Sequence, residues 1–428
     1  MQINGTPSAV SALRTQARRL VRAYGRVTDP DPLRSLQSQL GQRTTGMPGL
    51  VRIRRHSESC VCLDFKDGAL AYAFDLRVKA RQLELSVVGR DAMSRRVLRS
   101  SLVGLAPMVR DRGERHILSR WSGGRSARQR LVQETLAKMR WLTGLLQTLP
   151  HEAAPDRPVP LDHVLTYWWD QKPNFGDAIG PWLVGAMTGR PVVNSKWIEP
   201  QQPSLFTVGS VVGHLSVPGH NIWGSGIINE LGAEKAGRIG PNKPAAIHAV
   251  RGRLTRHELT TKLGWDVPEV YGDPALLLPK FMEPAQSKQA GKIAIVPHYL
   301  HKPYFAGVTD PQLNVVNVGN GLERVVSQIA HASHCISTSL HGIIIAHAYG
   351  VPWTWLRVGD HILHGDNFKF EDFFSVLARD EVTEAIIGAE QIAKTDFVKL
   401  AQAARLPADT LSPGPLLDAF PSTLSSMN

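Results

Sequence analysis

Residues 334–353, HCISTSLHGIIIAHAYGVPW, contain the stretch that decides the fold. A short β-prone run ends at Ser337-Thr338-Ser339, whose hydroxyls can accept hydrogen bonds from the free amides of a helix N-terminus. Residues 340–349 are apolar on almost every face, so they predict a buried helix packed on a sheet. Gly350 tolerates a positive φ and Pro352 cannot continue a helix, which marks the helix end. The order of strand, polar turn and buried helix predicts an α/β fold.

His341 makes the same stretch a candidate site. It lies in the first turn of the predicted helix beside Gly342, where a glycine lets a ligand approach the backbone closely. Free amides at a helix N-terminus favour an anion, and a bound phosphate or carboxylate would favour the protonated imidazole. The alternative is a core histidine with a satisfied hydrogen bond. The combination of strand, hydroxyls, His-Gly and buried helix favours the site.

Three further motifs accompany Ser339-Leu-His-Gly and its Gly-Val-Pro-Trp ending. They are Asn174-Phe-Gly-Asp177, the run from Val250-Arg251-Gly252 to Arg256, and Tyr271-Gly-Asp-Pro274. In this order the four motifs resemble those of the polysaccharide pyruvyl transferases, in particular the succinoglycan-type exopolysaccharide branch. The resemblance covers residues 165–380. One such motif is weak, whereas four in the family's order are specific.

The resemblance implies both a fold and a reaction. The fold would be GT-B-like, with two Rossmann-like halves and a cleft between them. The reaction would transfer pyruvate from phosphoenolpyruvate onto two hydroxyls of one sugar, as a cyclic ketal, with release of phosphate. The acceptor would be an oligosaccharide or a lipid-linked glycan used for an exopolysaccharide or the cell surface. Phosphoenolpyruvate is then the donor substrate, and no cofactor is expected.

This chemistry requires cations for the donor, an acid for its methylene carbon and a base for the attacking hydroxyl. We expect Arg251 and the amides of residues 339–342, which include Leu340, to bind the anion. His341 would act as the acid or as the partner of the leaving phosphate. Asp177, with Asn174 beside it, would contact a sugar hydroxyl. The roles of His341 and Asp177 could also be exchanged.

One residue departs from the broad family pattern. Many members carry Arg directly before Leu-His-Gly, where this chain has Ser339. Part of the donor site must then come from elsewhere, and the candidates are Lys369, Arg256 and Arg357. Since Ser-Leu-His-Gly also occurs in the succinoglycan-like branch, the change indicates a branch rather than a lost activity.

Length and charge predict the domain organisation. A chain of 428 residues is expected to form two or three domains. Residues 1–150 contain 27 Lys and Arg against 11 Asp and Glu, and the remainder contains 22 against 26. The basic character therefore belongs to the N-terminal third, which would attract anionic lipid, an acidic polymer or nucleic acid.

The N-terminal third is predicted to be an accessory region, residues 1–150. Residues 11–26 predict a basic amphipathic helix, either with a solvated arginine face or in contact with an anionic membrane surface. Residues 50–89 alternate as strands do, with a turn at Lys66-Asp67-Gly68, and predict a small antiparallel sheet. Residues 127–149 predict an amphipathic helix, and the Pro-rich residues 150–160 predict a linker.

The remainder predicts two α/β units, residues 161–285 and residues 290–428, the second ending in helices. The first opens with a strand at 161–168, a polar loop and a helix at 178–188. Ligands gather at the carboxyl ends of strands in such folds, so Asn174 and Asp177 lie where substrates bind. Asp177 could equally be the N-cap of that helix.

Several classes of protein are disfavoured. The chain has no apolar run long enough to span a bilayer and no signal-peptide core, so we expect a cytoplasmic protein, with peripheral contact at the inner face of the plasma membrane as an alternative. It lacks a P-loop and a Gly-x-Gly-x-x-Gly fingerprint. We interpret Cys60, Cys62 and Cys335 as packing residues and expect no metal site.

Two other functions stay open at this point. A glycosyltransferase of similar two-lobed shape would use a nucleotide sugar instead of phosphoenolpyruvate. A non-enzymatic protein that binds anionic polymers would depend on the basic N-terminal region, although nucleic acid is not the partner we expect.

Overall fold

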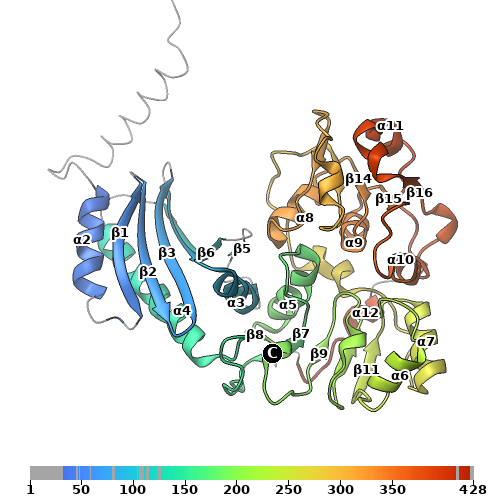
Figure 1. The fold of residues 1–428 in the computed structure, drawn as a ribbon, viewed down its shortest axis with the longest axis horizontal. Helices are drawn as coiled ribbons and strands as arrows, with labels where there is room; N and C mark the ends of the chain where they lie inside the picture. The colour runs from blue at the N-terminus through green and yellow to red at the C-terminus, as the bar shows by residue number, and fades with distance from the viewer. Residues whose placement is uncertain are drawn as a thin grey trace, which may run out of the picture. The chain divides into compact units, whose positions relative to one another are not determined.

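The computed structural model describes residues 32–44, 47, 49–57, 59–79, 82–103, 105, 110–111, 115–122, 127–410 and 414–424. The predicted basic helix at residues 11–26 lies outside them. Contacts divide the chain into an N-terminal unit, Met1–Arg95 with Arg115–Gln147, and a C-terminal unit, Arg96–Glu114 with Thr148–Asn428. Figure 1 labels the elements of both units.

A six-stranded sheet has the order β1-β2-β3-β4-β6-β5, and its strands other than β5 belong to the N-terminal unit. Its strands are β1 (Leu50–Ser57), β2 (Cys60–Asp67), β3 (Leu70–Lys79), β4 (Gln82–Gly89), β5 (Arg110–Asp111) and β6 (His116–Ser122). The pairs from β1 to β4, and β4 with β6, are antiparallel, which confirms the predicted antiparallel sheet. The predicted hairpin turn is also confirmed, with Gly68 at a φ of +55°.

The two faces of this sheet differ because side chains alternate along a strand. One face is apolar and includes Phe65, Tyr72 and Phe74, whose rings contact one another. Helix α4 (Ala127–Thr148) packs on it, and Tyr72 Oη donates to Thr143 Oγ1 over 3.4 Å. The predicted amphipathic helix at residues 127–149 is therefore confirmed. A further helix of this unit is α2 (Pro32–Thr44), whereas most of α3 (Ala92–Val103) belongs to the C-terminal unit.

The C-terminal unit contains two five-stranded parallel sheets. The first has the order β11-β10-β9-β7-β8, with β7 (Val164–Tyr167), β8 (Val192–Asn194), β9 (Leu205–Phe206), β10 (Asn221–Trp223) and β11 (Ala246–Ala249). The second has the order β13-β12-β14-β15-β16, with β12 (Ile293–Val296), β13 (Leu313–Val315), β14 (His334–Ser337), β15 (Trp353–Val358) and β16 (Glu384–Ile387). The predicted α/β fold is confirmed, with parallel sheets.

Helices connect these strands. They are α5 (Phe175–Thr188), α6 (Ala233–Ile239), α7 (Arg253–Leu263), α8 (Leu322–Ala330), α9 (Leu340–Ala348), α10 (Asp366–Phe374), α11 (Phe397–Ala401) and α12 (Gly414–Asp418). The 3₁₀ helix η3 (Pro274–Lys280) ends the first half. The chain then returns to that half at its far end, where Trp223 Nε1 donates to the carbonyl of Leu416 over 2.8 Å. Among the described residues, no helix is both long and apolar enough to cross a membrane.

Both parallel sheets have the same strand order when their strands are counted along the chain, 2-1-3-4-5. In each sheet the direction of winding reverses between the first and third strands, which are β7 and β9 in one half and β12 and β14 in the other. Doubly wound folds bind ligands outside the carboxyl ends of the strands at this reversal. The topology therefore selects the loops that follow these four strands.

Candidate active site

The loops that follow β7 and β14 bring the two halves into contact. Phe175 at the start of α5 donates its amide to the carbonyl of Val318 over 2.9 Å. The next residue, Gly176, lies against the ring of His341, because a Cβ at Gly176 would lie 2.2 Å from His341 Nδ1. The N-termini of α5 and α9, one from each half, therefore meet at the imidazole.

Asn174 is the N-cap of α5, and Asp177 lies inside its first turn. The Oδ1 of Asn174 accepts from the amide of Gly176 over 3.3 Å, and its Nδ2 donates to Oδ2 of Asp177 over 2.8 Å. The alternative that Asp177 caps this helix is wrong, because the helix begins at Phe175, three residues earlier than predicted. The carboxylate of Asp177 is left available for other chemistry.

The pKa of Asp177 is shifted toward neutrality, which suits its carboxyl to proton transfer. Burial raises its pKa to about 7, while the hydrogen bond from Asn174 opposes the rise. The neighbouring charge of Asp170 raises the pKa further. A carboxyl of this kind is partly protonated near neutral pH and can either donate or accept a proton.

The ring of His341 is enclosed by backbone on two sides. A Cβ at Gly176 would clash with the ring, whereas a Cβ at Gly209 would lie 3.5 Å from His341 Cε1, an ordinary contact. Glycine is favoured at 209 by its φ of +91° instead. The Nε2 atom is buried and has no hydrogen-bond partner within the described part of the chain. Its nearest acidic atom is Oδ2 of Asp273 at 3.9 Å, which is too long for a hydrogen bond. An unpaired buried nitrogen costs stability, which is typical of a group kept for a ligand.

Asp273 is an acidic neighbour of His341 to which the sequence gave no role. Its side chain is fully buried, Oδ1 accepts from the amide of Ala275 over 3.0 Å, and Oδ2 accepts from the amide of Gly209 over 3.1 Å. These bonds fix the carboxylate beside His341. The order Asp273-Pro274 is the local signal for an N-cap followed by the first helical residue, and it predicts the cap but not the distant histidine.

The electrostatics of His341 favour the neutral imidazole. Burial lowers its pKa, and the positive charges of Arg251 and Lys369 lower it further. The carboxylate of Asp273 opposes them. At neutral pH, in the absence of a bound anion, the ring is therefore suited to accept a proton.

The hydroxyls before α9 do not cap it as expected. Ser339 is the N-cap residue but makes no side-chain capping bond. Its amide donates to Ser337 Oγ over 2.9 Å, and the Thr338 hydroxyl accepts from the amide of His298 over 2.8 Å. The Ser339 amide therefore already has a hydrogen-bond acceptor at the end of β14. Of the predicted anion site at residues 339–342, only the amides after Ser339 stay candidates.

Gly342 and Leu340 serve packing in this structure. A Cβ at Gly342 would lie 2.3 Å from Ser337 Oγ and 2.9 Å from Val296 Cγ1. The glycine thus allows α9 to approach β12 and β14, and the expectation that it admits a ligand stays a prediction. The side chain of Leu340 is buried in the hydrophobic core.

Arg251 is placed differently from the expectation. Its side chain is fully buried, with Nε donating to Asp372 Oδ2 over 2.8 Å, one terminal nitrogen to Ser210 Oγ over 2.5 Å and the other to the carbonyl of Ile227 over 2.7 Å. Its guanidinium is therefore already engaged by protein groups, and this arrangement favours a structural role over contact with substrate.

The three alternative cations are separated by the structure. Arg256 contacts its own segment, through the carbonyl of Val267 at 3.0 Å and the carboxylate of Glu269 at 3.4 Å. Arg357 pairs with Glu384 at 2.8 Å. Lys369 lies close enough to His341 and His298 to lower the pKa of both. Of the three, Lys369 is the cation that acts on the site.

Two aromatic residues that follow β12 also belong here, although sequence reasoning gave them no role. Burial lowers the pKa of His298 to about 3, so this imidazole is neutral. The ring of Tyr299 contacts that of His298 at a tilt of 35°, with centroids 4.3 Å apart. The Nζ of Lys172 lies 5.4 Å from the centroid of the Tyr299 ring. Their position at the end of the first strand of the second half was the signal that could have identified them.

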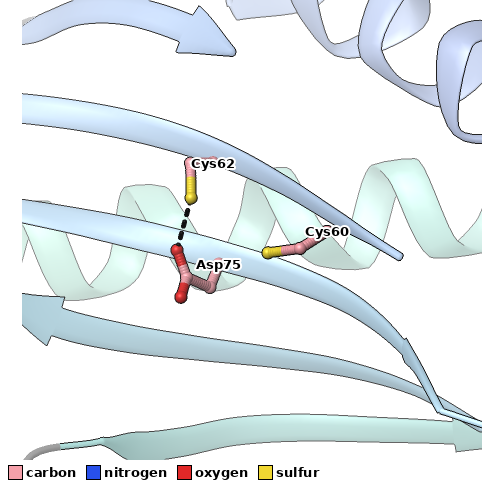
Figure 2. A group of neighbouring side chains, drawn as sticks. All are labelled: Cys60, Cys62 and Asp75. Atoms are coloured by element: carbon pink, nitrogen blue, oxygen red, sulfur yellow. Dashed lines mark hydrogen bonds between the residues drawn. The ribbon is translucent and has the colours of Figure 1, made fainter. Parts of the chain in front are cut away.

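Two other features lie outside this site. A cavity of about 620 Å³ is lined mainly by residues 281–289, and none of the residues above lines it. Within the described residues, the one group of side chains with the composition of a metal site is Cys60, Cys62 and Asp75, in the N-terminal unit (Figure 2).

Comparisons with known proteins agree with the motifs. Residues 218–361 match the family model described as polysaccharide pyruvyl transferase. The chain is 27% identical over 220 residues to the succinoglycan biosynthesis protein ExoV of Rhizobium meliloti (strain 1021), covering 49% of this chain and 64% of that protein. It is 32% identical over 143 residues to the uncharacterized protein L143 of Acanthamoeba polyphaga mimivirus, covering 31% of this chain and 50% of that protein.

The chain thus spans less than two thirds of the length of either relative. No solved structure gives a significant match. The family match includes Arg251, Asp273 and His341, while Asp177 and Lys369 lie outside it. The resemblance drawn from the motifs is confirmed: residues 218–361 match the polysaccharide pyruvyl transferase family model, and the chain is similar to a succinoglycan biosynthesis protein.

Proposed function

We propose that this protein transfers pyruvate from phosphoenolpyruvate to two hydroxyls of one sugar in a glycan precursor, as a cyclic ketal. The family match and the succinoglycan relative support this class of transfer. The observation that carries the proposal is the meeting of two proton-transfer groups from different halves. The ring of His341, with its unpaired Nε2, lies against Gly176, and the next residue is Asp177, whose pKa is about 7.

The proposed reaction conserves atoms and charge. A proton is added to the methylene carbon of phosphoenolpyruvate, which becomes the methyl group of the ketal. One sugar hydroxyl forms a C–O bond to the adjacent carbon, and the second hydroxyl forms another as the bond to phosphate breaks. Of the two hydroxyl protons, one replaces the proton given to the methylene carbon and the other leaves with phosphate. No oxidant or reductant is required.

The acidities favour one of the two role assignments left open by the sequence. Asp177 has a raised pKa and holds a proton near neutrality, so we assign it as the acid that protonates the methylene carbon. His341 has a lowered pKa and is neutral, so we assign it as the base for the sugar hydroxyl. Asp273 would stabilise the imidazolium that forms, as a buried carboxylate beside a base does.

The donor anion requires positive charge and free amides near His341. We assign Lys369, together with the first amides of α9, to the phosphate or carboxylate of the donor. Arg251 would then act indirectly, by holding the two halves in register. The GT-B-like architecture suggested by the resemblance belongs to the same proposal, because two parallel halves meet at this site.

We further propose that the N-terminal unit assists with an acceptor at an anionic surface, such as a lipid-linked glycan at the inner face of the plasma membrane. Arg52, Arg54 and Arg90 all bond to the single carboxylate of Asp64, at 3.0, 2.8 and 2.6 Å. Three guanidiniums against one carboxylate leave a local positive excess on the polar face of the sheet. Such an excess attracts anionic lipid, and the attraction weakens as salt rises.

One experiment tests the function. The full-length protein is incubated with phosphoenolpyruvate and a panel of lipid-linked oligosaccharides, and phosphate release and product mass are measured. We expect phosphate release that depends on the acceptor, with a product carrying one added pyruvate ketal. Parallel incubations contain UDP- and GDP-sugars. Transfer from a nucleotide sugar instead would show a glycosyltransferase, and binding of an anionic polymer without turnover would show a binding protein.

A further inference from the structure

The N-terminal unit brings two thiols and a carboxylate together beneath its polar face. Cys60 and Cys62 are two residues apart on β2, so their side chains point to the same side. Asp75 on β3 is paired directly with Cys62. The three ligand atoms lie within 4.8 Å of one another, and the residues are only 2%, 1% and 3% exposed. Figure 2 shows the three side chains converging from these two neighbouring strands.

From this convergence we propose that Cys60, Cys62 and Asp75 form a binding site for a zinc-type divalent cation. Thiolate sulfur and carboxylate oxygen are both zinc ligands, at about 2.3 Å and about 2.0–2.2 Å. Ligand atoms around a tetrahedral zinc of this size lie about 3.5–3.8 Å apart, which the side chains reach by small rotations. Two sulfurs exclude magnesium and calcium, which require oxygen ligands.

The hydrogen bonds of Asp75 suit this role. Its Oδ2 accepts from Arg77 and from Arg115, each over 3.1 Å, and these bonds orient the carboxylate. Its Oδ1 accepts from the thiol of Cys62 over 2.7 Å. The oxygen that faces the sulfurs is therefore held in place by a thiol proton, and a metal ion that displaces this proton takes its position between the same atoms.

The guanidiniums around the cluster offset the charge that its ligand atoms would carry with a metal ion bound. Two thiolates and one carboxylate would carry three negative charges, and a divalent ion offsets only two of them. Arg77 and Arg115 offset the remainder, and Arg54 interacts electrostatically with Cys62.

A disulfide between the two cysteines is the main alternative, and the strand geometry disfavours it. Residues two apart on an extended strand have Cα atoms separated by about 6.6 Å, close to the upper limit of about 6.8 Å for a disulfide. The β2–β3 register is unbroken at both cysteines, Cys60 opposite Arg77 and Cys62 opposite Asp75. A bound metal ion would join the two strands without distorting them, so the site would stabilise the N-terminal unit.

Zinc retention by the full-length protein tests the proposal. The reduced protein is stripped with a chelator, incubated with Zn²⁺, separated from free metal by gel filtration and analysed by mass spectrometry of the metal. We expect one zinc per chain, and on Co²⁺ substitution a thiolate-to-cobalt charge-transfer absorption. Zn²⁺ should also raise the Tm, because a ligand that binds only the folded state stabilises it.

Three variants locate the metal. Cys60→Ser, Cys62→Ser and Asp75→Asn should each weaken zinc retention by about tenfold or more. Asp75→Asn keeps the size of the side chain, so it tests the site even if a cysteine variant fails to fold. The matched control is Cys335→Ser, a buried lone thiol on β14, which should retain zinc fully. The proposal is overturned if the wild type retains no stoichiometric zinc, if the three variants retain it as well as the control, or if peptide mapping shows a Cys60–Cys62 disulfide after reduction and metal loading.

Discussion

Arg251 in the first half of the C-terminal unit donates from Nε to Oδ2 of Asp372 in the second half over 2.8 Å, and both side chains are fully buried. Asp372 also accepts from the amide of Thr255 over 2.7 Å and from its hydroxyl over 2.6 Å. A buried ion pair is tolerated only where such additional bonds satisfy its remaining atoms. The pair therefore fixes the N-terminus of α7 against α10 and holds the two halves in register around His341.

We predict that Arg251→Lys lowers the free energy of unfolding by about 3 kcal/mol. A lysine ammonium cannot make all the hydrogen bonds of the planar guanidinium, so some of its buried partners would be left unpaired. Urea unfolding at pH 7, followed by far-UV circular dichroism, measures the change. The control is Arg357→Lys, at a more exposed pair with Glu384, where the expected cost is below about 1 kcal/mol.

A different result would return Arg251 to the substrate. If Arg251→Lys were as stable as the wild type but raised the KM for phosphoenolpyruvate, the guanidinium would have to contact the donor. The original expectation from the sequence would then be correct.

The case of Arg251 shows where prediction from sequence stops. The sequence predicted the helices and strands well, because their signals, the period of apolar residues and the positions of Gly and Pro, lie within each element. The buried helix after Ser339, for example, is followed by Gly350 at a φ of +71°. Local patterns also placed Asp177 and His341 at strand ends. The partner of Arg251, however, lies 121 residues away, and no local signal distinguishes a buried carboxylate from an anionic substrate.

The same limit explains the other differences. Asp273 and His341 are placed together by tertiary contacts, so sequence reasoning noticed the first only as part of a motif. Asn174 and Asp177 are both good N-caps, and only the start of α5 decides between them. The sequence did not group the cysteines of β2 with Asp75, because Asp75 comes from β3.

Gly176→Ala should lower turnover by about 100-fold while leaving the fold intact. Alanine is favoured over glycine in a helix by about 1 kcal/mol, but its Cβ would lie 2.2 Å from His341 Nδ1 and must displace the ring. A displacement of about 1 Å at a catalytic group costs about this factor. The control is Gly237→Ala in α6, where a Cβ meets nothing within 4 Å and turnover should not change. Equal turnover in the two variants would show that the position of the ring is unimportant.

Asn174→Ser tests the acid assignment through pH. The Nδ2 of Asn174 lowers the pKa of Asp177, so its loss should raise that pKa above about 7, while serine still caps α5. If Asp177 acts in its protonated form, the falling limb of kcat/KM against pH moves to higher pH. If instead the rising limb moves, Asp177 acts as the base and the two roles are exchanged. An unchanged profile would exclude Asp177 from proton transfer.

Asp177→Asn should stabilise the protein at high pH even as it removes activity. The folded pKa of about 7 lies above the unfolded value of about 3.9, so the contribution of Asp177 to stability is present below pH 4 and is lost as pH rises through 7. The stability gained by the substitution should therefore grow from pH 4 to pH 7 and then level off, in urea unfolding at a series of pH values. Asp162→Asn is the control, because a hydrogen bond with His163 lowers the pKa of Asp162 and the pH trend has the opposite sign. A flat difference for Asp177→Asn would mean that its pKa is ordinary.

The final prediction concerns His341, and it separates catalysis from folding. His341→Leu should lower turnover by about 10²–10⁴-fold, since it removes a general base. The same change deletes a buried nitrogen that has no partner among the described residues, so the free energy of unfolding should rise by about 1 kcal/mol. An inactive but stabilised enzyme cannot be explained by a damaged core.

The matched control lies on the same helix. His347 is also buried, but its Nε2 pairs with Asp409 over 2.9 Å and its Nδ1 accepts from Trp353 Nε1 over 3.3 Å. His347→Leu should therefore lose stability, by about 1–3 kcal/mol, and keep its turnover when corrected for the folded fraction. Phosphate release from phosphoenolpyruvate and urea midpoints measured on both variants decide the matter. If His341→Leu lost stability as His347→Leu does and kept its turnover, His341 would be a core histidine. The proposed base would then have to be sought at His298 or Tyr299, which follow the neighbouring strand β12.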